Sequence, residues 1–248
     1  MNVLDRALAG AQQTVPVPAA NRSAFIIGNT GKLGEELLNV LLESPRYSRV
    51  CVGVRKPMRS HVPKLESVVG PTARADWDPC AGMKRVPEDL YLCIEPETKS
   101  FWRIAKPYLA VSSAWAVALA RRMRAAGARR VAVITPLEAL LQTGMVSAIR
   151  DTDEMSIFEA GFERMLVLRP VSEGKTASVP GFFAKVGGMV MQTLGSYMTP
   201  KALQPVRIRR AAQFAVDALA PMDDGVQVIG AARLRELVGD PMEAKRLS

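Results

Sequence analysis

Residues 24–56 read AFIIGNTGKLGEELLNVLLESPRYSRVCVGVRK, and this stretch decides the fold. A short apolar run at residues 24–27 leads into three glycines spaced three residues apart. Leucines at helical spacing follow at residues 37–42, and a second apolar run occupies residues 50–54. This order predicts a strand, a glycine-rich turn, a helix and a second strand.

The three glycines have separate roles in such a unit. Gly28 permits the sharp exit from the strand, Gly31 lets backbone amides face a pyrophosphate, and Gly34 lets the helix pack against the sheet. The helix N-terminus adds unpaired N–H groups and a partial positive charge. The alternative is a structural turn that binds nothing. The predicted dinucleotide-binding residues of the turn are Gly28, Asn29, Thr30, Gly31, Lys32, Leu33 and Gly34.

Strands and helices continue to alternate along the chain, which predicts an α/β fold with a doubly wound, mostly parallel sheet. A weak, polar third strand is expected before Asp76. The later strands are expected at 90–94, 131–134, 165–168 and 226–229, and the helices at 110–126, 151–160, 206–219 and 231–238. In such sheets a ligand lies over the carboxyl ends of the strands.

The chain of 248 residues is long enough for one such domain. Residues 1–21 form an expected N-terminal arm, and residues 22–248 form the domain. The periodicity weakens after residue 170, so we expect residues 171–248 to form a small C-terminal extension for substrate or partner interaction. The Met-rich residues 189–198 could cover a substrate cleft, although plain core or an oligomer contact explains them as well.

The GxxGxxG spacing, within its strand and helix, resembles that of the extended and atypical short-chain dehydrogenase/reductases. The chain is most similar to their NmrA-like group, which includes the human Tat-interacting protein, over roughly residues 22–238. The resemblance implies a Rossmann fold, NAD(P) binding and reductase activity on a small organic substrate.

The end of the second predicted strand bears on the choice of cofactor. Arg55, Lys56 and Arg59 stand there with no carboxylate nearby. A ribose hydroxyl of NAD prefers a carboxylate, whereas a 2′-phosphate needs cations, so we expect NADP(H) rather than NAD(H). A plain surface turn is the alternative. Asp76 and Trp77 resemble the aspartate and apolar residue that the family places beside the adenine.

The residues that catalyse the family's reaction are not retained in the sequence. The family carries a tyrosine and, four residues later, a lysine. Counted back from the Arg169–Pro170 pair, these positions fall on Val146 and Arg150. Valine cannot transfer a proton. Thr135, Glu95 and Arg150 are therefore the remaining catalytic candidates, with a solvated loop charge as the plainer explanation of Glu95.

Other function classes have less support. The net charge of +9 suggests nucleic acid, but the basic clusters lie on separate elements and only 6% of residues are aromatic. The single histidine, His61, offers no triad and no metal site. No apolar run is long enough for a membrane span, and the first residues do not resemble a secretion signal. The three unpatterned cysteines indicate the cytoplasm or another reducing compartment.

Two functional hypotheses follow. The first is an NADP(H)-dependent oxidoreductase that works without the usual tyrosine, using Thr135 or water as the acid. The second is a catalytically silent nucleotide-binding protein that senses the cofactor or serves as a subunit of a larger assembly. The expected partners are a dinucleotide, a small-molecule substrate and a protein partner or second copy of the chain.

Overall fold

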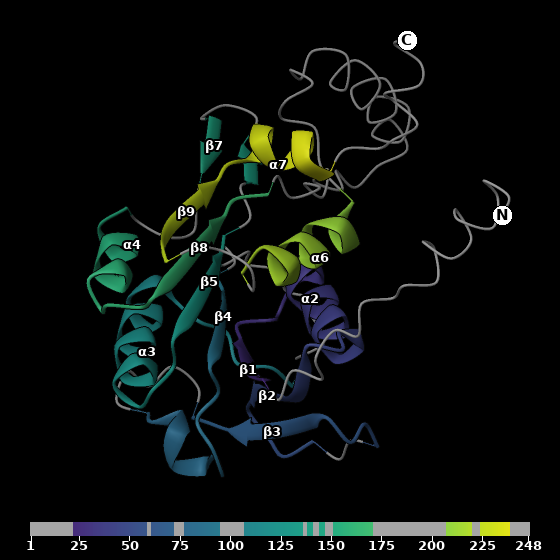
Figure 1. Cartoon of the computed structure of the whole chain (residues 1–248), viewed down its shortest axis with the longest axis vertical. Coiled ribbons are helices and arrows are strands. Elements are labelled where there is room, and N and C mark those ends of the chain that lie inside the picture. The colour runs from purple at the N-terminus through teal and green to yellow at the C-terminus, as the bar shows by residue number, and fades with distance from the viewer. Residues whose placement is uncertain are drawn as a thin grey trace, which may run out of the picture.

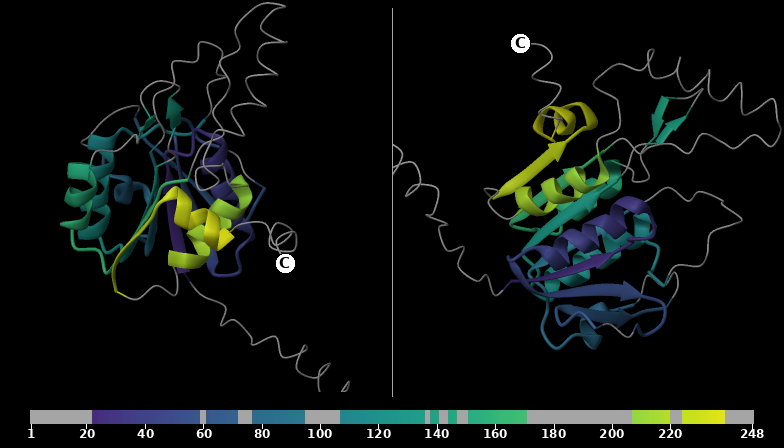
Figure 2. Two further views of the ribbon diagram at one scale, coloured as in Figure 1. Left: turned by 90° about the horizontal axis from the view of Figure 1, so that it is seen from above. Right: turned by 90° about the vertical axis from the view of Figure 1, so that its right-hand side faces the viewer.

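The computed structural model describes residues 22–58, 61–71, 77–94, 107–135, 138–140, 144–146, 151–170, 207–219 and 224–238. Seven parallel strands form one sheet in the order β3-β2-β1-β4-β5-β8-β9 (Figures 1 and 2). The strands are β1 (Arg22–Ile27), β2 (Tyr47–Val54), β3 (Leu65–Val69), β4 (Asp89–Cys93), β5 (Arg130–Ile134), β8 (Arg164–Leu168) and β9 (Gly225–Ile229).

Helices cover both faces of this sheet, as Figure 1 shows. The helices α2 (Lys32–Glu43) and α6 (Ile208–Leu219) lie side by side on one face, and α3 (Ser113–Ala125) and α4 (Asp151–Phe158) lie on the other. The short helix α7 (Ala231–Val238) follows β9. The predicted doubly wound α/β fold is confirmed.

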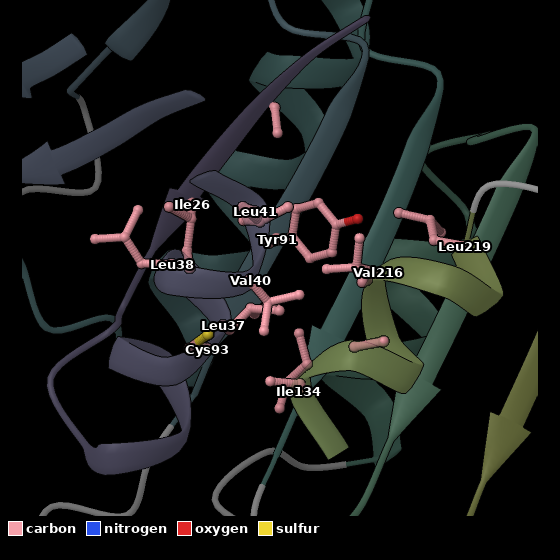
Figure 3. Packing of buried hydrophobic residues seen from close by; sticks show 14 of the residues in the cluster. Ile26, Leu37, Leu38, Val40, Leu41, Tyr91, Cys93, Ile134, Val216 and Leu219 are labelled. Atoms are coloured by element: carbon pink, nitrogen blue, oxygen red, sulfur yellow. The ribbon is translucent and has the colours of Figure 1, made fainter. Parts of the chain in front are cut away.

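The alternation of side chains along each strand divides the core into two layers. In β1, Ala24 and Ile26 pack in the layer beneath α2 and α6, while Phe25 and Ile27 pack in the layer beneath α3. Figure 3 shows the first layer, where leucines of α2 meet side chains of α6 over the sheet. All four β1 side chains are completely buried, which explains why this strand reads as a continuous apolar run.

A buried polar network joins the amino ends of three strands. The Tyr47 hydroxyl donates to Asp89 Oδ2 at 2.7 Å, and Arg130 Nε donates to Asp89 Oδ1. Because the Tyr47 proton is used for Asp89, the Tyr91 hydroxyl, 2.8 Å away, donates to the Tyr47 oxygen. The carboxyl group of Asp89 is completely buried, and the network fixes β2, β4 and β5 against one another.

The structure differs from the sequence-based expectation in three places. The third strand is Leu65–Val69, several residues earlier than expected, and a short helix, η1 (Pro79–Gly82), follows it. A hairpin of β6 (Glu138–Leu140) and β7 (Gly144–Val146) was not expected, because three-residue strands carry no readable periodicity. The expected N-terminal arm and residues 171–206 of the expected C-terminal part lie outside the described residues.

Candidate functional site

The glycine-rich turn lies at the carboxyl end of β1, at the point where the strand order reverses between β1 and β4. Gly28 adopts φ +83°, a conformation that favours glycine. A Cβ atom at this position would lie 1.9 Å from the backbone oxygen of Cys93, at the end of β4. Glycine is therefore required at position 28 for two reasons, the backbone conformation and the contact with β4.

Helix α2 begins directly after this turn, with Gly31 as its N-cap and no side chain capping its first amides among the described residues. Asn29 is completely buried between the strand and the helix, and neither polar atom of its amide has a hydrogen-bond partner in the described part of the chain. A Cβ at Gly34 would lie 2.5 Å from Asn29 Cα. Gly34 therefore lets the helix approach the turn, whereas the sequence argument had it approach the sheet.

The remaining turn residues are accessible to differing degrees. Gly31 is buried, Thr30 and Leu33 are partly buried, and Lys32 is exposed. The Thr30 amide donates to the Gly28 carbonyl at 2.7 Å, which tightens the turn. The uncapped start of α2 and the exposed Lys32 are suited to an anion, and the unpaired amide of Asn29 is buried directly beside them.

Arg55 and Lys56 stand directly after β2, as predicted, with Arg55 partly buried and Lys56 exposed. Residues 107–109, which we call the strap, run antiparallel to this tip of β2. The Arg55 amide donates to the Pro107 carbonyl at 2.8 Å, and the Leu109 amide donates to the Gly53 carbonyl at 3.1 Å. The strap could not be predicted from the sequence, because two backbone bonds leave no pattern in the side chains.

Trp77 lies at the end of β3 and belongs partly to the core beneath α3. A Cβ at Gly70 would lie 2.6 Å from its indole ring, and its ring centroid lies 6.0 Å from that of Trp115. Arg122 Nη1 donates to the Trp77 carbonyl at 2.7 Å. Trp77 is thus fixed by α3. Its predicted neighbour Asp76, and Arg59 beyond the tip of β2, lie outside the described residues.

Thr135 follows β5 at the same carboxyl edge of the sheet. It is completely buried, and its Oγ1 atom has no partner within the described ranges. Ile134 pairs with Leu168 in the register of β5 and β8, so Thr135 stands opposite Arg169, and its amide donates to the Leu168 carbonyl at 2.9 Å.

An ion pair of α4 lies beside Thr135. Arg169 Nη2 donates to Glu154 Oε2 at 2.6 Å, while Glu154 Oε1 is buried without a partner among the described residues. In the sequence, capping and the helix dipole explain Asp151, Asp153 and Glu154 at the start of this helix, so the pairing of Glu154 with Arg169 was not predicted.

The other two catalytic candidates, Glu95 and Arg150, lie outside the described residues. Val146, at the position counted for the family's tyrosine, belongs to strand β7, and the following helix begins only at Asp151.

The described residues contain no cluster that could hold a metal ion, and the three cysteines are free thiols. None of the helices within those residues is long and apolar enough to span a membrane. Several basic residues are paired across elements, as in Arg129 with Glu163 and Arg209 with Glu36 and Glu43. This pairing supports solvated element surfaces over a nucleic-acid face.

No protein-family model matches the sequence, and no curated protein matches it significantly. Among solved structures, the chain is similar to the Bordetella bronchiseptica enzyme WbmH, crystallised in complex with NAD⁺. The two are 15% identical, with a TM-score of 0.50 over 91% of this chain and 82% of WbmH. A short-chain dehydrogenase/reductase family oxidoreductase from Burkholderia thailandensis is 12% identical, with a TM-score of 0.49 over 92% of this chain and 97% of that one.

The fold that the resemblance implied is thereby shown. The strand order, with its reversal between β1 and β4, is that of a doubly wound dinucleotide-binding sheet. Together with the likeness to WbmH, it identifies the domain as a Rossmann fold.

Proposed function

We propose that this chain is an NADP(H)-binding, reductase-like protein. The observation that carries the proposal is the glycine turn at the strand-order reversal, with the buried, unpartnered amide of Asn29 beside an uncapped helix N-terminus. Buried polar groups in folded proteins are hydrogen-bonded in the great majority of cases, so an unpaired amide at this place indicates a missing acceptor or donor. The NAD⁺ bound to WbmH, which shares the fold, supports a dinucleotide as that ligand.

Each part of the edge has a role in this proposal. The first amides of α2 would hold the pyrophosphate, because they point away from the helix and carry its partial positive charge. Arg55 and Lys56 would hold the 2′-phosphate of NADP(H), since a guanidinium binds phosphate in a bidentate manner. Asp76 and Trp77 would border the adenine.

The reaction is the second part of the proposal. A bound NADPH would supply a hydride to a small carbonyl substrate. The accompanying proton would come from water or from the Thr135 hydroxyl, which is unpaired among the described residues at the carboxyl edge of β5 and would regain a proton from water. Glu95 remains a candidate for the same role, whereas the positive charge of Arg150 would hold ribose or phosphate, because arginine is not a tunable acid.

A catalytically silent nucleotide-binding protein is the second candidate function. Val146 offers no proton and stands in a strand, and Glu154 is already paired with Arg169. Such a protein would bind NADP(H) as a sensor, or as a subunit of a larger assembly, without turnover.

Calorimetric titration with NADPH and NADH tests nucleotide binding. We expect NADPH to bind more tightly, Gly31→Val to abolish binding of both nucleotides, and a double change of Arg55 and Lys56 to alanine to weaken NADPH alone. The matched control changes Lys84 and Arg85, an equally charged exposed pair before β4, to alanine. Absence of binding of either nucleotide would overturn the proposal, and equal losses would show that Arg55 and Lys56 do not read the phosphate.

A substrate screen separates the two candidate functions. Aldehydes, ketones and quinones are offered together with NADPH, and oxidation of the nucleotide is followed. General acid catalysis contributes about 10²- to 10⁴-fold to rate, so turnover at ordinary enzyme rates would exclude the silent protein. Loss of that turnover in Thr135→Val, with NADPH affinity retained, would then identify the acid.

A further inference from the structure

The strap occupies the position that β1 vacates. Within the sheet, β1 pairs with β2 up to Ile26 opposite Val52, and the chain then turns away at Gly28. Beyond this point the strap takes over the same edge of β2, through Tyr108 opposite Val54. The backbone of residues 107–109 therefore lies directly outside the carboxyl end of β1.

This is the place where a Rossmann fold binds the adenosine half of a dinucleotide. Arg55 and Lys56, which are proposed to read that half, lie beside the strap at the tip of β2. Burial is the largest cause that raises the pKa of the Tyr108 hydroxyl in the strap, and the charge of Glu35, in the first turn of α2, raises it further.

Within the described residues, two backbone bonds join the strap to β2, and the strap is anchored in the core at one end. Pro107 has no N–H group, so it donates no third bond. Two such bonds favour the attached strap over the detached strap by about 30-fold. Leu109, in contrast, is completely buried in the core beneath α3.

We propose that the strap is an autoinhibitory gate over the adenosine site, and that it leaves the tip of β2 when NADP(H) binds. The proposal rests on the proposed nucleotide binding. The strap and the adenosine ribose compete for the same edge of β2, so binding breaks the two bonds between them. The nicotinamide half of the site, over β4 and β5, lies apart from the strap.

Amide hydrogen exchange, measured by nuclear magnetic resonance with and without saturating NADPH, tests this gate in the unaltered protein. We expect the Arg55 and Leu109 amides to exchange faster in the presence of NADPH, while the Gly31–Gly34 amides exchange more slowly. Slower exchange at all of these positions would show that the strap is a fixed wall of the site and would overturn the gate.

The substitution Leu109→Ala loosens the anchor of the strap and gives a second test. We expect this variant to bind NADPH and 2′,5′-ADP at least fivefold more tightly than the unaltered protein, and nicotinamide mononucleotide equally well. The control is Leu119→Ala, which removes an equally buried leucine from the same core layer. Weaker binding by Leu109→Ala alone would overturn the gate.

The failures of the two proposals are distinguishable. If neither the unaltered protein nor Leu109→Ala binds any of the three probes, the proposed nucleotide binding fails. If NADPH binds while the Arg55 and Leu109 amides stay protected, nucleotide binding stands and the gate fails.

Discussion

Buried polar groups differ between the two edges of the sheet at which the strands begin and end, which we call the amino edge and the carboxyl edge. At the amino edge, Tyr47, Asp89, Tyr91 and Arg130 satisfy one another's hydrogen bonds. At the carboxyl edge, the amide of Asn29, the hydroxyl of Thr135 and one oxygen of Glu154 are buried with no partner in the described chain. A folded protein contains few unsatisfied buried groups, so the presence of three such residues at this edge is informative.

The difference has a thermodynamic meaning. A satisfied buried network adds stability and fixes the register of the strands, because breaking it leaves charges and hydroxyls unpaired in a medium of low dielectric constant. An unsatisfied buried group lowers stability, by roughly 1 to 3 kcal/mol. Such groups can be completed by a ligand, which is why we propose that the amino edge stabilises the fold and that the carboxyl edge binds the nucleotide.

The largest effect is expected at the amino edge, from Asp89→Ala. This change leaves the buried guanidinium of Arg130 and the hydroxyl of Tyr47 without their main acceptor. Removing one partner of a buried ion pair typically lowers the free energy of unfolding by about 3 to 5 kcal/mol. Urea unfolding followed by circular dichroism measures the loss.

The control for this prediction is Asp224→Ala. The Asp224 side chain is 77% exposed and pairs with Arg164 at the start of β8, so its loss should change stability far less. If the two variants unfold at similar urea concentrations, the amino-edge network does not hold the sheet together. If Asp89→Ala does not fold at all, Tyr47→Phe provides the milder version of the same test.

The next largest effect is expected at the carboxyl edge, from Asn29→Ala. Losing a charge-assisted hydrogen bond to phosphate should weaken NADPH binding by about 10- to 100-fold. The free energy of unfolding should change by less than about 1 kcal/mol, since no internal hydrogen bond of the amide is lost. The matched control is Asn39→Ala, an exposed asparagine in helix α2, which follows the turn that holds Asn29. A large loss of stability with unchanged NADPH affinity would assign Asn29 to the core.

The structural features that depend on burial and on glycine could be predicted from the sequence. The run of residues 24–27 and the spacing of Gly28, Gly31 and Gly34 specified β1, its turn and α2, because each local preference agrees with the fold. The amino-edge network could not be predicted, since Tyr47, Asp89 and Arg130 meet only through strand pairing. The strap could not be predicted for a similar reason. The backbone bonds between residues 53–55 and 107–109 do not depend on the type of side chain.

Thr135→Val makes the contrast between the edges sharper, because it can be paired with Tyr47→Phe. Both changes remove one buried hydroxyl at nearly constant volume. Thr135 loses an unpartnered group, so the free energy of unfolding should rise by about 1 kcal/mol, while Tyr47→Phe should lower it by a similar amount. Urea unfolding of both variants measures the two signs. Destabilisation by Thr135→Val would mean that its hydroxyl has an internal partner, and the binding assignment of this edge would lose one of its three supports.

The smallest effect concerns the pH dependence of stability at the amino edge. Burial is the largest cause that raises the pKa of both Tyr47 and Tyr91, and the neighbouring carboxyl group of Asp89 raises them further. A group whose pKa is raised by folding stabilises the protein fully below its unfolded pKa, near 10, and this contribution is lost as the pH rises towards the folded pKa. Burial also raises the pKa of Cys51 and of Cys80 to about 11, so these thiols add to the same alkaline loss.

Comparison of the unaltered protein with Tyr47→Phe isolates one tyrosine, because the contributions of the thiols and of Tyr91 are common to both. Between pH 9 and 10.5 the unfolded tyrosine ionises while the folded one stays protonated, which corresponds to about 0.8 kcal/mol for one group. The unaltered protein should therefore lose about 0.8 kcal/mol more over this range than Tyr47→Phe, although the variant is the less stable of the two at pH 8. Urea unfolding at pH 8, 9, 10 and 10.5 measures both slopes. Equal slopes would show that the Tyr47 hydroxyl has the same pKa in the folded protein as in the unfolded chain. That result would contradict the burial of this hydroxyl between Asp89 and Tyr91.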